Sequence, residues 1–375
     1  MDPQQIFCPN LACPARGQIG EGNIHVHSQK DRRYRCDVCR KTFAETKCTP
    51  FYRLRTAQET VTIVITLLAY GCPLQAIVVA FGVDERTVQA WHRRAGQHCQ
   101  QVHEHRVEQP RDVGQVQADE LRVKYQRGIV WMALALQVST RLWLGGVVSA
   151  QRNLALIVAL MHKVRACALR RSMLICSDGL AAYRRAIRQV FRDPQAHSGR
   201  YGRPHLKPWR GLYIAQVVKQ YAGHRVVALT RRIIQGRRGA VERLLRRTQG
   251  SGGINTAYIE RLNATFRARL GHLVRRSRAL ARQVPTLEQG MYLIGTVYNF
   301  CTCHDSLRLR RRGRPDQAGH RWHERTPAMA AGLTDHCWSV QEVLSFHVPP
   351  SRWTPPKRRG RWSKATHTLV ARWCS

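Results

Sequence analysis

The chain has 375 residues, which is long enough for two or three domains, one of them with a sizeable core. Its 62 lysines and arginines against 23 aspartates and glutamates give a formal net charge of +39 at pH 7. A charge of this size disfavours a protein whose surface serves solubility alone, and it favours a polyanionic partner, usually nucleic acid. Arginine supplies most of the excess, which suits bidentate contacts to phosphate groups.

The N-terminus and the cysteine count bear on the cellular compartment. The first ten residues, "MDPQQIFCPN", have neither the basic region nor the apolar region of a signal peptide. Thirteen cysteines, an odd number in a large chain without a secretion signal, indicate a reducing compartment and metal ligation rather than a disulfide framework. We therefore expect a cytoplasmic protein.

Two close pairs of cysteines stand near the N-terminus, in "CPNLAC" and, after 22 residues, in "CDVC". Four thiolates arranged in this way can close a tetrahedral site, so residues 1–50 are predicted to form a zinc ribbon with one structural Zn²⁺. His25 and His27 could replace a cysteine, although their alternation fits a strand better. The alternative is four free cysteines in a loop-rich arm. The predicted ligands are Cys8, Cys13, Cys36 and Cys39.

An apolar run covers residues 63–83 and is long enough to suggest a membrane span. Gly71, Cys72 and Pro73 interrupt it in the middle, and turn signals stand at the ends of both halves. We therefore expect two short buried helices here and no association with a membrane.

A third helix is predicted to follow the glycine turn at 82–83. Asp84 can cap its first turn, while Val88 and Trp91 lie on its inward face. A short helix, a tight glycine turn and a helix with exposed Arg and Gln match helix-turn-helix geometry. Residues 51–105 are thus predicted to be an α-helical DNA-binding domain, with an ordinary helical bundle as the alternative. The residues on the open face are Arg86, Gln89, His92 and Arg93.

Residues 106–305 alternate strand-like and helical runs, which predicts an α/β layered core. "VGQVQADELRV" is predicted to be a strand ending in acids, and "RSMLICSDGLAAYRRAI" a buried strand that breaks into a helix. Ligands gather at strand ends in such layers, which makes Asp119 and Asp178 candidates. Two carboxylates at neighbouring strand ends repel each other unless a divalent cation lies between them.

The stretch "NTAYIERLNATFRARLGHLVRRSR" is predicted to be an amphipathic helix with a single acid among several arginines. Glu260, Asn263 and Arg267 form one polar stripe on it, and Asn255 or Thr256 can cap its start. Packed against the sheet, Glu260 would complete a set of three hard oxygen donors, which suits Mg²⁺ or Mn²⁺. The apolar stripe beside it contains Ile259, Leu262, Phe266, Leu270 and Leu273.

Two other acids compete for a place in this set. Glu242 in "VERLLRR" also offers an acid on a basic helix, but nothing after it corresponds to Asn263 or to the capped start. Glu120 follows Asp119 directly, and strand alternation points the two to opposite faces, so only one is expected to serve. If neither aspartate is functional, Asp119 is a strand-end salt bridge and Asp178 a helix cap.

These acids carry a resemblance to a known family. The order Asp119, Asp178, Glu260 resembles the DDE triad of transposases with a ribonuclease-H-like core. "NTAYIERLNATFRARLGHLVRRSRAL" is similar to the third-acid helix of the insertion-sequence-one group of bacterial transposases, which also carries an N-terminal zinc ribbon and helix-turn-helix. "YNFCTCHDSL" and "RTPAMAAGL" resemble the segment that closes the core in related integrase-type transposases. The resemblance covers roughly residues 8–335.

The resemblance implies a transposase that binds the terminal inverted repeats of an insertion sequence, cleaves the 3′ ends and joins them to target DNA. Two Mg²⁺ or Mn²⁺ ions would be held by the three acids. The protein would act on double-stranded DNA as a homo-oligomer, associated with the bacterial nucleoid. Further residues expected to contact DNA or the ligand shell are Asn263, Arg267, Arg275 and Arg276.

Residues 306–375 are predicted to be a basic C-terminal extension, of which the tail 351–375 is expected to have little regular structure. Its last part, 351–375, contains no acid and would add affinity for phosphate. Two other functions fit the same pattern. One is a regulatory or decayed DNA-binding protein that uses the N-terminal modules without catalysis, and the other is a nuclease of the same fold that cuts without joining.

Overall fold

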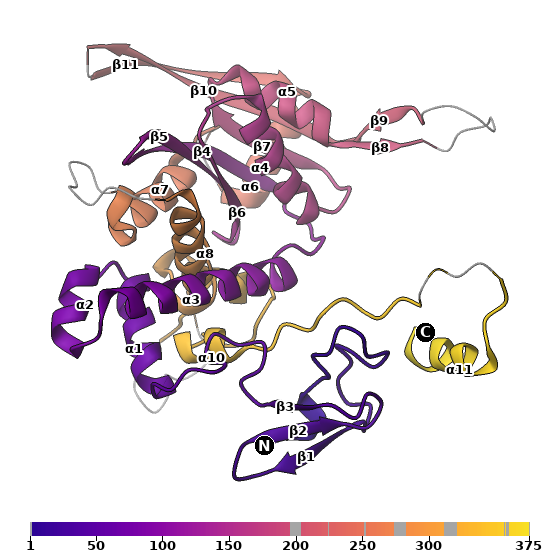
Figure 1. Ribbon diagram of the computed structural model, residues 1–375. Helices are drawn as coiled ribbons and strands as arrows, with labels where there is room; N and C mark the ends of the chain where they lie inside the picture. The colour runs from indigo at the N-terminus through magenta and orange to yellow at the C-terminus, as the bar shows by residue number, and fades with distance from the viewer. Residues whose placement is uncertain are drawn as a thin grey trace. The chain divides into compact units, whose positions relative to one another are not determined.

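The computed structural model describes residues 2–195, 204–223, 225–250, 253–273, 283–310, 321–355, 357 and 360–374. The chain divides into two compact units, one of Met1–Val61 with Leu344–Ser375 and the other of Thr62–Val343. The protein is a multidomain α/β chain, and a mixed six-stranded sheet dominates the second unit (Figure 1). In the part of the chain that is described, no helix has both the length and the hydropathy of a membrane span.

The first unit contains a small antiparallel sheet in the order β1-β2-β3. Its elements before the sequence enters the second unit are η1 (Pro3–Gln5), β1 (Ile24–Ser28), β2 (Arg33–Cys36) and β3 (Thr42–Ala44). The four cysteines of the predicted zinc ribbon lie around this sheet. The core buries Cys8, Cys13, Ala15, Ile24, Tyr34, Cys36 and Trp373.

The C-terminal segment completes this core. Helix α11 (Lys364–Trp373) begins at Ser363, whose side chain accepts a hydrogen bond from the Thr366 backbone N–H. Trp373 is buried in the cysteine core, and Leu369 packs against it. The expectation of little regular structure in the tail was therefore wrong here, because the apolar side chains of one short helix find their core in residues more than 300 positions away.

The second unit follows a helical, then sheet, then helical order. Its helices and strands are α1 (Gln58–Ala69), which begins just before the boundary, α2 (Leu74–Phe81), α3 (Glu85–Arg106), β4 (Gln115–Tyr125), β5 (Gly128–Gln137), β6 (Trp143–Ser149), α4 (Leu154–Ala166), β7 (Met173–Asp178), α5 (Ala181–Val190), β8 (Arg192–Pro194), β9 (Leu206–Pro208), β10 (Leu212–Ala222), β11 (Arg225–Gln235), α6 (Arg238–Gln249), α7 (Ala257–Arg269), η2 (Gly271–Leu273), α8 (Val284–Cys301), η3 (Asp305–Leu307), β12 (Leu309–Arg310), β13 (Trp322–His323), α9 (Pro327–Ala330) and α10 (Val340–Ser345), which ends just past the boundary.

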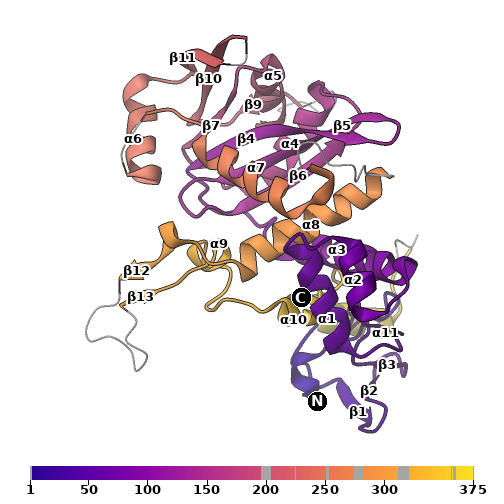
Figure 2. The same cartoon turned by 90° about the vertical axis from the view of Figure 1, so that its left-hand side faces the viewer.

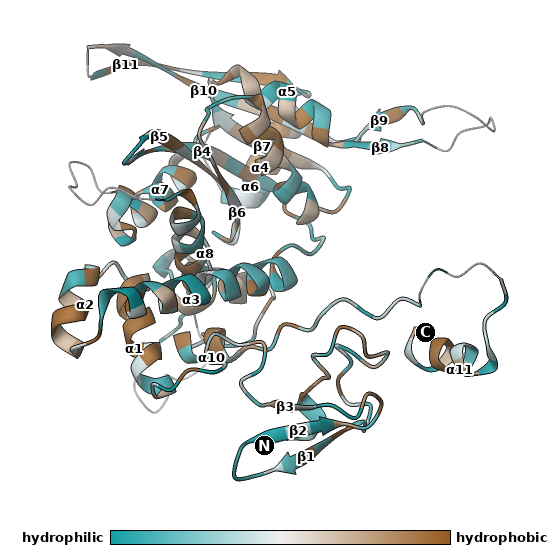
Figure 3. Ribbon diagram, in the orientation of Figure 1, coloured by the Kyte–Doolittle hydropathy of each residue, from teal (hydrophilic) through white to brown (hydrophobic). Residues whose placement is uncertain are grey.

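The large sheet has the strand order β11-β10-β7-β4-β5-β6. Strands β4, β5 and β6 form an antiparallel meander, β7 runs parallel to β4, and β10 runs parallel to β7. Strand β11 pairs antiparallel with β10 at the outer edge. Strand β5 reads "GIVWMALALQ", is buried over most of its length and is brown in the hydropathy view (Figure 3). This composition fits an interior strand, and β5 lies between β4 and the edge strand β6.

Helices cover both faces of the sheet (Figure 2). Helices α4 and α5 pack on each other and on one face, and α6 and α7 contact β4 from the other face. The alternation of side chains along β4 follows this arrangement, because Gln115 bonds to Thr248 of α6 while Gln117 bonds to Asn255 before α7. Every second residue of β4 therefore faces α7 and its neighbours.

The three predicted helices before the sheet are present as α1, α2 and α3. Gly82 ends α2 with φ +60°, and the Asp84 side chain accepts hydrogen bonds from the Arg86 and Thr87 backbone N–H groups at the start of α3. Gly96 lets α3 approach α8 closely, since a Cβ there would lie 2.6 Å from the Gln289 backbone. Helix α3 thus packs with α8 inside the second unit.

Candidate functional site

Strands β4 and β7 bring Asp119 and Asp178 to the same level. Their parallel ladder runs from Gln115–Leu174 to Gln117–Cys176, and the same register continued would set Asp119 opposite Asp178. Asp119 lies in the middle of β4 and not at its end as expected, because pairing with β5 continues to Tyr125. The two aspartates therefore lie side by side just beyond the last paired residues of β4 and β7, where the two strands separate.

Three carboxylates form a cluster at this opening. One oxygen each from Asp119, Glu120 and Asp178 lies within 4.8 Å of the others, which is close enough to hold a metal ion together. Strand alternation predicted that Glu120 points away from Asp119, yet one carboxylate oxygen of each lies close to the other. The two occupy alternate positions on β4, and of the two only Asp119 lines the neighbouring cavity.

The cluster is electrostatically unfavourable without a counter-charge. Burial, followed by the neighbouring Glu120 charge, raises the pKa of Asp119 to about 7. Burial also raises the pKa of Glu120, whose side chain is inaccessible and whose Oε1 is buried without a hydrogen-bond partner. Hard oxygen donors crowded in this way match the coordination preference of a divalent cation such as Mg²⁺.

Helix α7 is attached to β4 beside the cluster. The Gln117 side-chain Oε1 accepts hydrogen bonds from the backbone N–H groups of Tyr258 and Ile259, both 3.0 Å long, and so caps the first turn of α7. One turn further on, Asn263 Nδ2 donates to Asp119 Oδ2 at 2.8 Å. The predicted apolar stripe of this helix is buried as expected.

Glu260 shares a cavity with the two aspartates. The cavity has a volume of about 340 Å³, and its lining includes Asp119, Arg152, Asp178, Lys219, Thr256 and Glu260. Glu260 lies outside the group of three close carboxylates, and its Oε1 contacts Lys219 Nζ at 2.5 Å and the Thr256 hydroxyl at 2.9 Å. The structure thus brings the predicted triad to one cavity.

The rival acid lies elsewhere. Glu242 sits on α6, about half exposed, and pairs with Arg238 at 2.9 Å within the same helix. It is not among the residues that line the acid cavity. Of the two candidate third acids, only Glu260 faces Asp119 and Asp178 across a common space.

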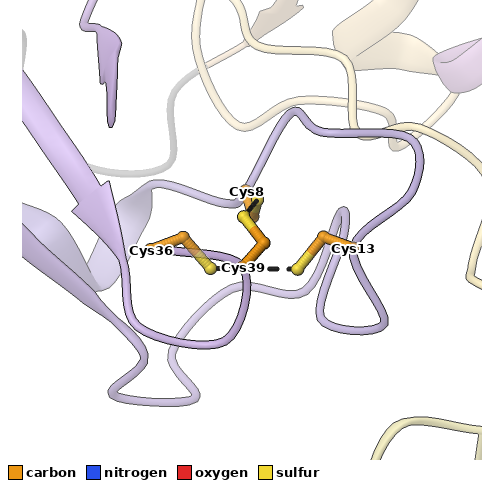
Figure 4. A group of neighbouring side chains, drawn as sticks. All are labelled: Cys8, Cys13, Cys36 and Cys39. Carbon is orange, nitrogen blue, oxygen red and sulfur yellow. Dashed lines mark hydrogen bonds between the residues drawn. The ribbon is translucent and has the colours of Figure 1, made fainter. Parts of the chain in front are cut away.

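The four cysteines of the first unit form a second cluster, with their side chains turned toward one another (Figure 4). Cys8 and Cys39 place their sulfurs 3.6 Å apart, and Cys13 and Cys36 place theirs 3.9 Å apart. Four sulfurs at about 2.3 Å from a tetrahedral ion would be about 3.8 Å apart, so the cluster fits a metal of that geometry. The cluster can hold a metal ion.

The surroundings favour the neutral thiol at Cys8 and Cys13 and the thiolate at Cys39. Burial raises the pKa of Cys8 well above its usual range and that of Cys13 to about 12. For Cys39, burial is outweighed by hydrogen bonds from Asn10 and the Lys41 backbone, which lower the pKa to about 7. Asn23 also donates to Cys36 Sγ at 3.6 Å. Polar donors aimed at sulfur stabilise thiolates, the form that binds metal.

Three of the four predicted DNA-reading residues on α3 are exposed. Arg86, Gln89 and Arg93 face solvent, and Gln89 bonds to Glu85 one turn earlier. His92 differs, because it is partly buried and burial lowers its pKa to about 4. The ring of His92 lies against α8 at Gly290, 3.8 Å from the place that a Cβ would take there, and so does not share the open face.

The remaining predicted DNA contacts lie on and after α7. Arg267 is partly buried on the polar stripe of α7, one turn beyond Asn263. Arg275 and Arg276 lie outside the described residues.

Residues that sequence reasoning missed hold the site together. Arg152 bonds to Glu120 and Asp178, Lys219 bonds to Glu260, and Gln117 caps α7. A glutamine two residues before the first acid on the same strand face was a usable signal, because it predicts a polar group beside the α7 start. For Arg152 and Lys219 no local pattern distinguishes them among so many basic residues.

No protein-family model matches this sequence, and no curated protein matches it either.

Proposed function

We propose that the protein is a transposase of the DDE type, which binds the ends of an insertion sequence and catalyses metal-dependent 3′-end cleavage and strand transfer. The observation that carries this proposal is the meeting of Asp119, Asp178 and Glu260, from three separate elements, around one cavity. Their order along the chain and the sequence around Glu260 resemble the triad of that family.

The strand order supports a ribonuclease-H-like core. An antiparallel meander of three strands is followed by two strands that add in parallel on the other side of the first strand, with a helix between them. In such cores the first acid lies on the first strand and the second acid follows the next parallel strand, the positions that Asp119 and Asp178 occupy in β4 and β7. Strand β11 is an addition at the edge.

The residues of the cavity fit two Mg²⁺ or Mn²⁺ ions, which when bound would activate a water or a 3′-hydroxyl and stabilise the leaving oxygen. Asp119, Asp178 and Glu260 would supply oxygen ligands. Asn263, hydrogen-bonded to Asp119 and almost fully buried, fixes the orientation of that carboxylate. The cap from Gln117 fixes the start of the helix that carries Glu260.

The charge and the N-terminal elements supply the DNA affinity that this function needs. A net charge of +39 favours binding to a polyanion such as DNA. Helix α2, the turn at Gly82 and helix α3 support a helix-turn-helix. Its exposed Arg86, Gln89 and Arg93 would contact the major groove. The four cysteines would hold one structural Zn²⁺ in a zinc ribbon.

The test compares two acids on neighbouring helices. Glu260→Gln keeps volume and helix propensity and removes only the charge, so the variant should fold and bind end DNA as the parent does. Its cleavage and strand transfer in Mg²⁺ should fall by more than about 100-fold, because a metal ligand is lost. Glu242→Gln, the matched control, should leave both steps within about twofold.

Strand transfer is measured at matched DNA occupancy with both variants. An active Glu260→Gln would contradict the triad. Cleavage without joining by the parent would identify a nuclease of the same fold, and neither step in the parent would indicate a DNA-binding regulator.

A further inference from the structure

Arg152 lies between two acids of the carboxylate cluster. It stands on the loop between β6 and α4, directly before Asn153, whose side chain caps α4. Its Nη2 lies 2.8 Å from Glu120 Oε2 and 3.1 Å from Asp178 Oδ2, and its Nε donates to Glu120 Oε2 at 2.9 Å. The guanidinium also rests 4.9 Å from the ring centre of Trp131. A protein cation thus occupies the edge of the cavity.

The two acids hold Arg152 unequally. Glu120 accepts two contacts and its side chain is 0% exposed, whereas Asp178 accepts one and its side chain is 36% exposed toward the cavity. Breaking the Glu120 contacts would leave a buried charge without a partner, which is strongly unfavourable. Breaking the Asp178 contact would leave an accessible carboxylate, which a divalent ion can take over. The Glu120 contacts therefore anchor the arginine and the Asp178 contact is exchangeable.

A second basic side chain pairs with another acid in the same cavity. Lys219 of β10 contacts Glu260 at 2.5 Å, so a basic side chain holds an acid there as well. Of the three predicted ligands that line the cavity, Asp178 and Glu260 are therefore each neutralised by a cation of the chain. An ordinary surface ion pair would place such cations outside the cavity, whereas Arg152 and Lys219 both line it.

We propose that Arg152 is a phosphate-binding residue that neutralises Asp178 in the metal-free protein. Divalent ions that bind at Asp119 and Asp178 would release Arg152 Nη2 from Asp178, and the Glu120 contacts would keep the guanidinium at the cavity rim. The released N–H groups then donate to a phosphodiester oxygen of DNA, for which the planar guanidinium is well suited. This inference rests on the proposed function, and it assigns Glu120 as the anchor of Arg152 rather than as a metal ligand.

The first consequence concerns metal affinity without DNA. Arg152 competes with the metal ion for Asp178, so Arg152→Gln should bind Mn²⁺ about tenfold more tightly than the parent, as expected for a unit charge removed several ångströms from the ion. Because this variant leaves Glu120 buried and unpaired, the same substitution is also made in a Glu120→Gln background. The Mn²⁺ affinities of Glu120→Gln and of the double variant are then compared, which measures the effect of Arg152 in a protein without the buried Glu120 charge.

The second consequence concerns turnover. At saturating Mn²⁺ and matched DNA occupancy, Arg152→Gln should cleave end DNA at least about tenfold more slowly than the parent, because one phosphate contact at the cavity is lost. Arg152→Lys keeps the positive charge but lacks the paired N–H donors of the guanidinium, so it should recover only part of the cleavage rate. An arginine that only neutralises Asp178 would tighten Mn²⁺ binding when it is replaced but would leave the cleavage rate at saturating Mn²⁺ unchanged.

Mn²⁺ binding is measured on the full chain by the electron paramagnetic resonance signal of the free ion. Arg170→Gln is the matched control, because Arg170 pairs with Asp193 and lies outside the acid cavity, and its Mn²⁺ affinity should stay within about twofold of the parent. Unchanged or weaker Mn²⁺ binding after loss of Arg152 in both backgrounds, while Asp178→Asn abolishes binding, would overturn this inference alone. If Asp178→Asn also leaves Mn²⁺ binding unchanged, the metal site and the proposed function fail together.

Discussion

The cysteine cluster of the first unit and the carboxylate cluster of the second are both groups of metal-ligating side chains, but they are built in opposite ways. Three of the four cysteines are buried, and apolar residues surround them. The carboxylates instead open into a cavity of about 340 Å³ and are held by basic side chains. Closed metal sites commonly serve structure and sites with accessible positions serve chemistry, so we propose a stabilising role for the first cluster and a reactive role for the second.

The largest effect is expected from removing one thiolate. Cys36→Ser should abolish stoichiometric zinc and unfold the first unit, because structural zinc contributes on the order of 10 kcal/mol of binding free energy in small domains. Zinc content of the purified full chain and limited proteolysis of its N-terminal part measure the outcome. Cys48→Ser, at a partly buried cysteine of the same unit outside the cluster, should retain both zinc and resistance to protease. Equal zinc content in the two variants would exclude the four-cysteine site.

The next effect tests whether the closed cluster depends on the C-terminal helix. Trp373 is 1% exposed in the cysteine core, so Trp373→Ala should destabilise the first unit by roughly 3–5 kcal/mol and speed the loss of zinc to a chelator. Trp362→Ala is the control, because that ring is partly exposed on the same segment and contacts His367 edge-on. Identical zinc release from both variants would show that α11 does not contribute to the core.

Local sequence patterns predicted the helices and their ends well, but they did not predict the contacts between residues far apart in the sequence. The ends of α2, the cap at Asp84 and the apolar stripe of α7 follow from neighbouring residues, and the structure has them as expected. The two close pairs of cysteines likewise predicted the four-cysteine cluster. Trp373 in the N-terminal core and Arg152 between two acids depend on chain segments that only folding brings together, so no periodicity or spacing could reveal them.

Two further corrections have the same origin. Asp119 was expected at a strand end, but β4 continues because β5 pairs with it along its whole length. His92 was expected on an open face, but α8 covers it. In both positions a neighbour distant in the sequence decides the environment, which residue type alone cannot indicate.

We expect the carboxylate cluster, unlike the cysteine cluster, to lower the stability of the folded protein. The substitution Asp119→Asn measures this loss. Burial and the Glu120 charge raise the pKa of Asp119 to about 7, against about 4 in an unfolded chain. The folded state therefore binds this proton more tightly, and the stability so gained is complete below pH 4 and lost as the pH rises through 7. The variant should exceed the parent by roughly 1–3 kcal/mol at pH 8 and equal it below pH 4.

Thermal midpoints of the full chain without added metal, taken from pH 4 to pH 8, give this difference. Asp193→Asn is the control, because Asp193 pairs with Arg165 and Arg170 and its loss should lower stability at pH 8. Added Mg²⁺ should raise the midpoint of the parent and not that of Asp119→Asn. A variant that is less stable than the parent at pH 8 would mean that the acid cluster contributes to stability, and the contrast with the cysteine cluster would be lost.

The smallest effect on stability is expected at Gln117, which connects the open site to its scaffold. Gln117→Ala removes the acceptor for the Tyr258 and Ile259 backbone N–H groups and should cost about 1–2 kcal/mol. The rate of strand transfer should fall further, by about tenfold, because the first turn of α7 carries Glu260 and a small displacement of a ligand slows catalysis. Gln137→Ala is the matched control, since Gln137 is a buried glutamine on β5 that bonds to the Asp112 carbonyl and not to α7. It should lose similar stability with little loss of rate. If the two variants lose rate in proportion to stability, the cap on α7 supports the fold in general and does not position Glu260.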